Sequence, residues 1–349
     1  MKSFSDHKRG DIARFSVLAT LLVVICHTDD FFPVEWKTSV VRWLGGTFSD
    51  ANVSNFFFLS GFLLAVHYGE DRWWITAIRK RSRSLVIPYM AWNAILFAVF
   101  YLAGHVHGEC GIGRVFGLGF NRLPFNFVLW YVKTLVYFIL LSPGFFFIAS
   151  RTFLYVPACA ILLVVQCFGA RFIPGFSGML RYSFPIVGLT VFITGGYCRI
   201  HNLSFSSRLS RLPLVVPVAT WMILSWLVFC SQGRIPELLV LNEISGVFFL
   251  IWIASAAKWN IENPFFRRLS SCTFFIYAYH RTVLYAISKI TLKSNFVGNL
   301  ENNILQSVGS VAIFTFLFSV STLFCVATAA ILHRISPRLS SILSGGRMK

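Results

Sequence analysis

Long apolar runs separated by short polar segments dominate the chain. About ten of them are long enough to cross a bilayer as helices. They cover residues 11–28, 53–69, 85–104, 127–148, 153–169, 182–198, 212–230, 238–257, 271–291 and 305–333. The last run exceeds the length of one span, so an interfacial or bent portion is expected there. The pattern predicts an all-α polytopic membrane protein with about ten transmembrane helices.

The composition agrees with a membrane protein. Of the 349 residues, 56% are hydrophobic and 13% are charged, and the mean hydropathy is +0.70. A soluble domain of this size could not bury so much apolar surface. The net charge of +18 would indicate nucleic-acid binding in a soluble chain. Here the basic residues lie in short clusters between apolar runs, which favours contact with the lipid bilayer and no nucleic-acid partner.

The distribution of Lys and Arg predicts the orientation. With the amino terminus inside, the inner segments hold more than twice as many basic residues as the outer ones, so both termini are predicted to be cytoplasmic. The segments between the runs are too short for a second globular domain. We therefore expect a single transmembrane domain over residues 1–349, with a membrane core at 11–333 and a short basic cytoplasmic tail at 334–349.

The first apolar run has an ionisable residue near each end. Twelve uncharged residues separate Arg14 from His27, which in a helix is roughly 20 Å along the axis. An ionisable residue inside a membrane segment indicates a functional site. Alternatively, Arg14 is an interfacial anchor and His27 is the first residue of an outer loop. These residues alone leave the two interpretations equally weighted.

Four basic residues gather in RKRSRS, before the third run: Arg79, Lys80, Arg81 and Arg83. We expect this segment to be an inner loop at the mouth of a helix. Guanidinium groups bind phosphate oxygens in a bidentate manner, so the cluster suits a polyanion such as a nucleotide diphosphate. The alternative is ordinary anchoring by positive charge on the inner side, which the residues alone favour.

Other polar residues lie within the apolar runs. His280 and Arg281 are about ten residues into the ninth run, where a charge needs a partner or a polar cavity. In NFFFLSGFLL, the step from Ser60 to glycine favours close helix packing, and a nucleophilic Ser60 is the alternative. Trp130 and its neighbours in LWYVKTL are expected at the outer interface, as part of an aromatic belt. The cysteines form no CxxC pair, so no metal site is expected.

Five segments, in this order, resemble the acyltransferase 3 family. They are Arg14 with His27, NFFFLSGFLL, KRSRSLVIPY, LWYVKTLVYFILLSP and NPFFRRLSSCTFFIYAYHRTVLY. Members are integral membrane O-acyltransferases that modify bacterial surface polysaccharides and similar glycans, commonly with acetyl groups. The chain departs from the family in two places. The family usually has ten residues between the first arginine and histidine, and its Arg-x-x-Arg pattern is interrupted here, since Ser84 stands three residues after Arg81.

The resemblance implies an O-acetyltransferase of the bacterial cytoplasmic (inner) membrane. Acetyl-CoA or another acyl-CoA would be the donor substrate, with no permanently bound cofactor, and a glycan or polysaccharide would be the acceptor. Polysaccharide-biosynthesis proteins are possible partners. Two alternatives stay open: a polytopic transporter or flippase for a glycan or lipid-linked intermediate, and a member without catalysis that assists polysaccharide assembly.

The resemblance also implies roles for individual residues. His27 would be the general base on the acceptor hydroxyl, with Asp30 orienting its ring if the helix extends that far, and His280 with Arg281 would stabilise the oxyanion or position the donor. The expected catalytic residues are His27, Arg14 and His280; the expected acyl-CoA-binding residues are Arg79, Lys80, Arg81 and Arg83; and the expected supporting residues are Asn55, Ser60, Trp130, Tyr277 and Arg281.

Overall fold

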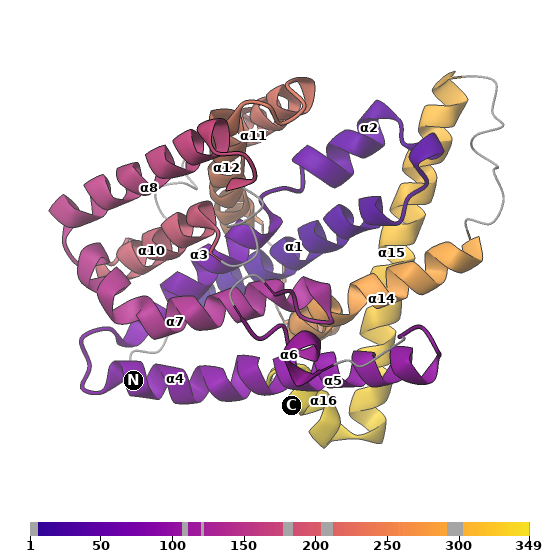
Figure 1. The fold of residues 1–349 in the computed structure, drawn as a ribbon, viewed down its shortest axis with the longest axis horizontal. Coiled ribbons are helices and arrows are strands. Elements are labelled where there is room, and N and C mark those ends of the chain that lie inside the picture. The colour runs from indigo at the N-terminus through magenta and orange to yellow at the C-terminus, as the bar shows by residue number, and fades with distance from the viewer. Residues whose placement is uncertain are drawn as a thin grey trace. The chain divides into compact units, whose positions relative to one another are not determined.

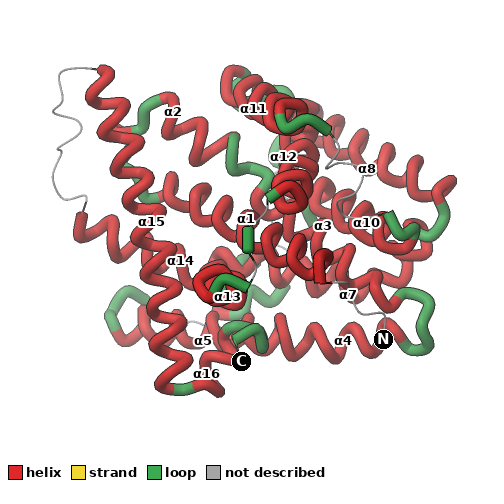
Figure 2. Tube along the Cα trace, turned by 180° about the vertical axis from the view of Figure 1, so that it is seen from behind, coloured by secondary structure: helices red, strands yellow, loops and turns green. Residues whose placement is uncertain are grey.

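The computed structural model describes residues 6–106, 111–119, 122–176, 184–203, 212–257, 259–260, 262–291 and 303–348. In these ranges the chain forms helices and loops, without a strand (Figure 2). A helix lies at each of the ten predicted positions, although the start of the sixth, at Tyr182, falls outside the described residues. The all-α prediction is therefore confirmed.

Within the described residues, six helical segments are long and apolar enough to cross a membrane: Arg9–Asp30, Trp73–Leu102, Phe127–Ala149, Thr152–Phe172, Pro236–Ala256 and Leu305–Ile335. Their number and composition fit a multi-pass membrane protein. The count of ten spans and the cytoplasmic location of both termini stay predictions.

The chain forms two compact units. Unit 1 comprises Met1–Phe4, Ser54–Phe205 and Ser336–Lys349, and unit 2 comprises Ser5–Val53 and Ser206–Ile335. Each unit is thus assembled from segments that are distant in sequence. The single transmembrane domain over residues 1–349 stays a prediction.

Unit 1 holds most of α3 (Asn52–Leu64), and then α4 (Trp73–Arg81), α5 (Ile87–Leu102), α6 (Ile112–Val115), α7 (Trp130–Ala149), α8 (Thr152–Phe172), α10 (Ile186–Ile200) and α16 (Pro337–Leu343). A π-helical turn at Ser82–Val86 joins α4 and α5 into one continuous helix (Figure 1). Helix α7 packs beside α4, and α10 packs against both α7 and α8.

The continuous helix corrects one prediction. The segment with Arg79, Lys80, Arg81 and Arg83 is helical and is not a loop. Lys and Arg are good helix formers, and three of the four, all except Arg81, are exposed, so the helix continues without burying their charges. Pro88 is tolerated because it lies at the start of α5, where its missing N–H costs little.

The Ser-Gly step in α3 packs as predicted. A Cβ on Gly61 would collide with the carbonyl of Phe192 in α10, and a Cβ on Gly195 would collide with the carbonyl of Phe58 in α3. The two backbones therefore approach each other as closely as glycine allows. This confirms that the small residues of NFFFLSGFLL serve helix packing.

Unit 2 holds α1 (Asp6–Asp30), α2 (Ser39–Arg42), a π-helical turn (Trp43–Thr47), α11 (Val215–Cys230), α12 (Pro236–Ala256), α13 (Pro264–Ser271), α14 (Thr273–Thr291) and α15 (Asn303–Ile335). Helix α1 is its central element, since it packs against α12, α14 and α15. The last apolar run forms one uninterrupted helix, α15, and the interfacial or bent portion that its length indicates stays a prediction.

The buried threonine hydroxyls of α1 are satisfied locally. The hydroxyl of Thr20 donates to the carbonyl of Ser16, and that of Thr28 donates to the carbonyl of Val24, at 2.8 and 2.7 Å. Such bonds to the preceding turn let hydroxyls be buried inside an apolar helix. The helix reaches Asp30 and ends shortly before Pro33.

Candidate active site

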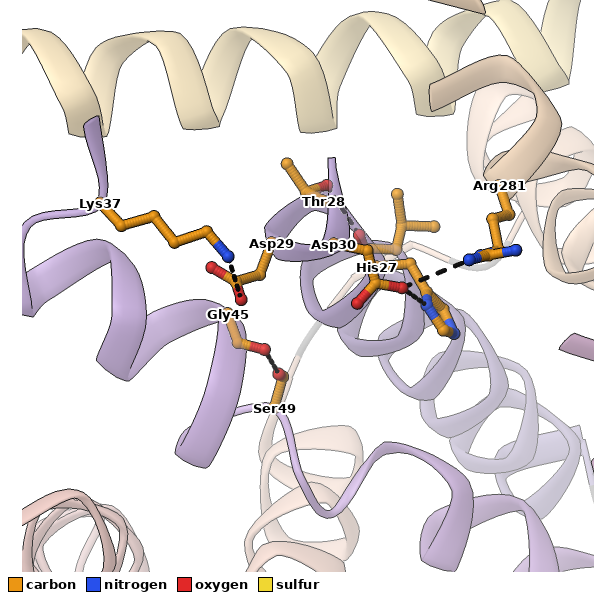
Figure 3. A network of polar contacts seen from close by, with 9 residues as sticks. His27, Thr28, Asp29, Asp30, Lys37, Gly45, Ser49 and Arg281 are labelled. Atoms are coloured by element: carbon orange, nitrogen blue, oxygen red, sulfur yellow. Dashed lines mark hydrogen bonds and ion pairs between the residues drawn. The ribbon is translucent and has the colours of Figure 1, made fainter. Parts of the chain in front are cut away.

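His27 lies in the last turn of α1, so it belongs to the helix and does not begin a loop. Its Nδ1 is 2.7 Å from Oδ2 of Asp30 (Figure 3). A spacing of three residues places both side chains on one face of a helix. The expectation that Asp30 orients the ring is therefore confirmed.

A second imidazole lies beside the first. His280, in α14, is fully buried, and its ring centroid is 5.2 Å from that of His27. The Nδ1 of His280 is 2.9 Å from the carbonyl oxygen of Ile276. Its Nε2 is buried and has no hydrogen-bond partner among the residues that the structure describes. Such a nitrogen is available to a bound molecule.

The hydrogen bonds fix the tautomer of both rings. A carbonyl oxygen and an ionised carboxylate only accept, so Nδ1 carries the proton in His280 and also in His27. In each neutral ring the lone pair therefore belongs to Nε2. The site presents two imidazoles whose Nε2 atoms accept protons or hydrogen bonds.

Arg281 completes the charged part of the site. Its Nε is 3.8 Å from Oδ2 of Asp30, the oxygen that also contacts His27 (Figure 3). The guanidinium also lies over the ring of Phe31, 5.4 Å from its centroid. Asp30 thus lies between a cation and an imidazole, which holds its carboxylate in place.

Tyr277 lies near His280. Its side chain is buried, and its ring centroid is 6.4 Å from that of His280. Of the five supporting residues predicted from the sequence, Tyr277 and Arg281 are therefore next to the two imidazoles.

The end of α1 is held by two residues that the sequence analysis did not single out, Asp29 and Lys37. Nζ of Lys37 is 2.9 Å from Oδ2 of Asp29 (Figure 3). The side chain of Asp29 packs on Gly45, where any Cβ would collide with it. These contacts anchor the helix turn that carries His27 and Asp30. The acidic doublet Asp29–Asp30, which follows His27 after one threonine, was the available signal in the sequence.

Arg14 has a different environment. It is buried at the other end of α1, and its Nη2 is 2.6 Å from Oδ1 of Asp11. Its Nε and Nη1 donate to the carbonyls of Ala254 and Trp259, at 2.7 and 3.1 Å. Ala254 is in the last turn of α12, where carbonyls lack partners within the helix. These contacts favour a packing role, and a catalytic role for Arg14 stays a prediction.

The remaining supporting residues belong to unit 1. Ser60 Oγ is 2.9 Å from the hydroxyl of Tyr131, which also donates to the carbonyl of Phe56 at 3.1 Å. Trp130 lies against Phe57, with ring centroids 6.5 Å apart. Asn55 is fully buried.

The placement of the aromatic belt needs a correction. Tyr131 lies within electrostatic range of Arg81, and the indole of Trp74 donates to the carbonyl of Ile139 at 3.1 Å. Helices α4 and α7 therefore run side by side in opposite directions, and the start of α7 is level with the basic cluster. Placing Trp130 and its neighbours on the membrane face opposite Arg81 was wrong, because the loop before α7 folds back along α5.

Lys133 holds that loop in place. Its Nζ donates to the carbonyls of Gly117, Gly119 and Arg122, at 3.3, 2.9 and 2.6 Å. An ammonium group has three donors, and all three are used here. Backbone carbonyls inside a membrane protein require such partners.

A comparison with known protein families tests the resemblance found in the sequence. The family model of this acyltransferase domain matches residues 15–330, nearly the whole chain. The chain belongs to the acyltransferase 3 family. No curated protein matches it, and no solved structure matches it. As a member of the family, the protein is a membrane acyltransferase, and its paired histidines and its partly accessible basic residue Arg81 are candidates for the chemistry of acyl transfer.

Proposed function

We propose that the protein is a membrane O-acyltransferase that transfers an acetyl group from cytoplasmic acetyl-CoA to a hydroxyl of a surface polysaccharide, an O-antigen or another glycan. The bacterial inner membrane is its proposed location. The observation that carries the proposal is the imidazole of His27, bonded to Asp30 and adjacent to His280 in a family of acyltransferases.

His27 acts as the general base. Its Nδ1–H donates to Asp30, so Nε2 takes the proton of the acceptor hydroxyl while the hydroxyl oxygen attacks the thioester carbonyl. Asp30 stabilises the imidazolium that forms. The new C–O bond forms, the C–S bond breaks, and the imidazolium returns its proton to the departing sulfur of coenzyme A. Atoms and charge balance without a metal or a redox group.

His280 positions the acceptor. Because its Nδ1–H is used by the carbonyl of Ile276, its Nε2 accepts a hydrogen bond and does not donate one. It therefore accepts from a neighbouring hydroxyl of the acceptor sugar, which orients the reacting hydroxyl toward the thioester, and it is unsuited to stabilise the oxyanion while neutral. Arg281, next to Asp30, is the cationic group available at this site.

The basic residues of unit 1 are the proposed site for the donor phosphates. Arg79, Lys80, Arg81 and Arg83 follow one another along a single helix. Coenzyme A carries several phosphate charges, and guanidinium groups are suited to bind them. We propose no permanently bound cofactor.

Deletion of the protein in its host tests the proposal. We expect surface glycans from the deletion strain to lack the mass of one acetyl group per modified unit, and we expect the wild-type chain to restore it. A chain with His27→Ala should be present in membranes at normal levels and should not restore the mass. A transporter or flippase would instead change the amount or length of glycan at the surface and leave its acetyl content unchanged, which would contradict the proposal.

A further inference from the structure

The end of the chain folds back onto the basic part of unit 1. Helix α16 packs against α5, and the indole of Trp92 donates to the carbonyl of Leu343 at 3.0 Å. Gly345, at φ +67°, packs so closely on the carbonyl of Ser84 that any side chain would collide with it. Positive φ and this close approach both require glycine there. The predicted basic tail is therefore docked on the π-helical turn after Arg81.

The residues on both sides of Arg347 are anchored. The backbone N–H of Met348 donates to the hydroxyl of Ser344 at 3.1 Å, and the hydroxyl of Ser340 lies 3.5 Å from the sulfur of Met348. Met348 itself is buried. With Gly345 fixed before it and Met348 after it, Arg347 has a defined position at the turn.

Arg347 lies within electrostatic range of Arg81 and of Tyr131. The side chain of Arg347 is exposed. Its pKa is lowered, first by partial desolvation near the protein and then by the charge of Arg81, while Tyr131 acts in the opposite direction. Arg81 is partly accessible as well. The hydroxyl of Tyr131, bonded to Ser60, lies at the same place.

The charges of Arg81 and Arg347 are within electrostatic range and repel each other, and an anion bound by both side chains removes that repulsion. A phosphate group matches this arrangement, because each guanidinium presents a planar pair of donors to two oxygens. Arg79, Lys80 and Arg83 are exposed, whereas Arg81 is only partly accessible and is the one that lies within electrostatic range of Arg347. The four basic residues predicted from the sequence are therefore not equivalent.

We propose that Arg81 and Arg347 together bind a phosphate group, so that the docked C-terminal segment, residues 336–348, forms part of a phosphate site. The assignment of this phosphate to acyl-CoA rests on the proposed function. A phospholipid headgroup offers the same chemistry, and the two sources are distinguished by experiment.

The test measures binding of coenzyme A by calorimetry to the full-length protein in detergent. We expect Arg81→Ala and Arg347→Ala each to raise the dissociation constant by about tenfold to a hundredfold, as for loss of a charge-assisted contact. The double variant should lose little more than each single one, because one anion needs both groups. Arg347→Lys should retain part of the affinity. Arg338→Ala, which removes an exposed charge from the same tail, is the matched control and should bind normally.

A second arm measures the rise in thermal midpoint caused by phosphatidylglycerol. If Arg81→Ala and Arg347→Ala abolish this rise and leave coenzyme A binding unchanged, the phosphate site is supported and its occupant is a lipid. If both variants melt normally and change neither coenzyme A binding nor lipid stabilisation, the phosphate site is refuted. Failure of the wild-type protein to bind coenzyme A would contradict the proposed function, while the lipid arm would still decide whether the site exists.

Discussion

The imidazole of His27 lies 5.2 Å from that of His280, centroid to centroid, although 253 positions separate them in the chain. Packing of α1 against α14 brings them together. Each ring uses Nδ1 for a fixed acceptor, a carboxylate for His27 and a backbone carbonyl for His280. The two rings therefore have the same tautomer and different chemistry, since only His27 has an anion to stabilise its protonated form.

Replacement of His27 tests the general base. We expect His27→Ala to lower kcat for acyl transfer by about 10²- to 10⁴-fold, the usual contribution of general base catalysis. Rates of coenzyme A release by purified protein provide the measurement. His67 is the matched control, because its Nδ1 is 2.9 Å from Glu70 with the same spacing of three residues. His67→Ala should leave the rate unchanged, and an equal loss in both variants would refute a specific role for His27.

The variant Asp30→Asn separates two effects of Asp30 on His27: orientation of the ring and stabilisation of its positive charge. The amide oxygen of Asn still accepts from Nδ1–H of His27, but it has no charge to stabilise the imidazolium. We expect kcat to fall about tenfold to a hundredfold, with KM for acyl-CoA nearly unchanged. Steady-state kinetics measure both constants, with Glu70→Gln as the control. A variant with full kcat would show that the His27–Asp30 pair has no part in the reaction.

His280 is predicted to act by binding and positioning the acceptor glycan. His280→Gln keeps an acceptor atom near the position of Nε2, whereas His280→Leu keeps only the volume. We therefore expect Gln to retain a substantial part of the activity and Leu to raise KM for the acceptor glycan strongly, with a smaller effect on KM for acyl-CoA. Equal behaviour of Gln and Leu would assign His280 to packing alone.

Arg14 is predicted to stabilise the fold. Arg14→Ala leaves Asp11 buried without its partner, which costs about 3–5 kcal/mol when one member of a buried pair is removed. A thermal or denaturant melt in detergent measures the loss. Removal of both charges, with Asp11→Ala in the same chain, should recover part of it. If Arg14→Ala melts normally but has lost activity, the family-based catalytic role is correct and the packing role is not.

Lys133 is predicted to fix the loop that precedes α7. Lys133→Met leaves the carbonyls of Gly117, Gly119 and Arg122 without their donor, so the chain at these residues should become more accessible to protease. Limited proteolysis and hydrogen exchange measure this opening. Lys289→Met, at an exposed site, is the control. Unchanged protection in Lys133→Met would show that other contacts hold the loop.

The sequence predicted the helices well because apolar length is a local property. It also identified His27, His280 and Arg281, since ionisable residues are conspicuous in apolar runs. It did not reveal that Arg281 contacts Asp30, because pairing between helices depends on tertiary packing.

The errors have physical causes as well. Arg79 to Arg83 were assigned to a loop because charge normally marks the end of a span, yet three of these side chains reach solvent from a helix. The start of α7 was assigned to the outer interface by assuming that successive spans alternate in direction across the membrane. That assumption fails where a connecting segment folds back, as it does before α7, where Lys133 satisfies the carbonyls of the segment. Docking of the C-terminal tail depends on Gly345, and one glycine gives no signal in a sequence.

The most direct test of the account is the release of coenzyme A from acetyl-CoA by the purified, full-length protein, with deacetylated host glycan as acceptor. We predict release that requires the glycan, accompanies a gain of one acetyl mass on it, and is abolished by His27→Ala but not by His67→Ala. Thioester that stays intact with correctly folded wild-type protein, or release that persists in His27→Ala, would contradict it.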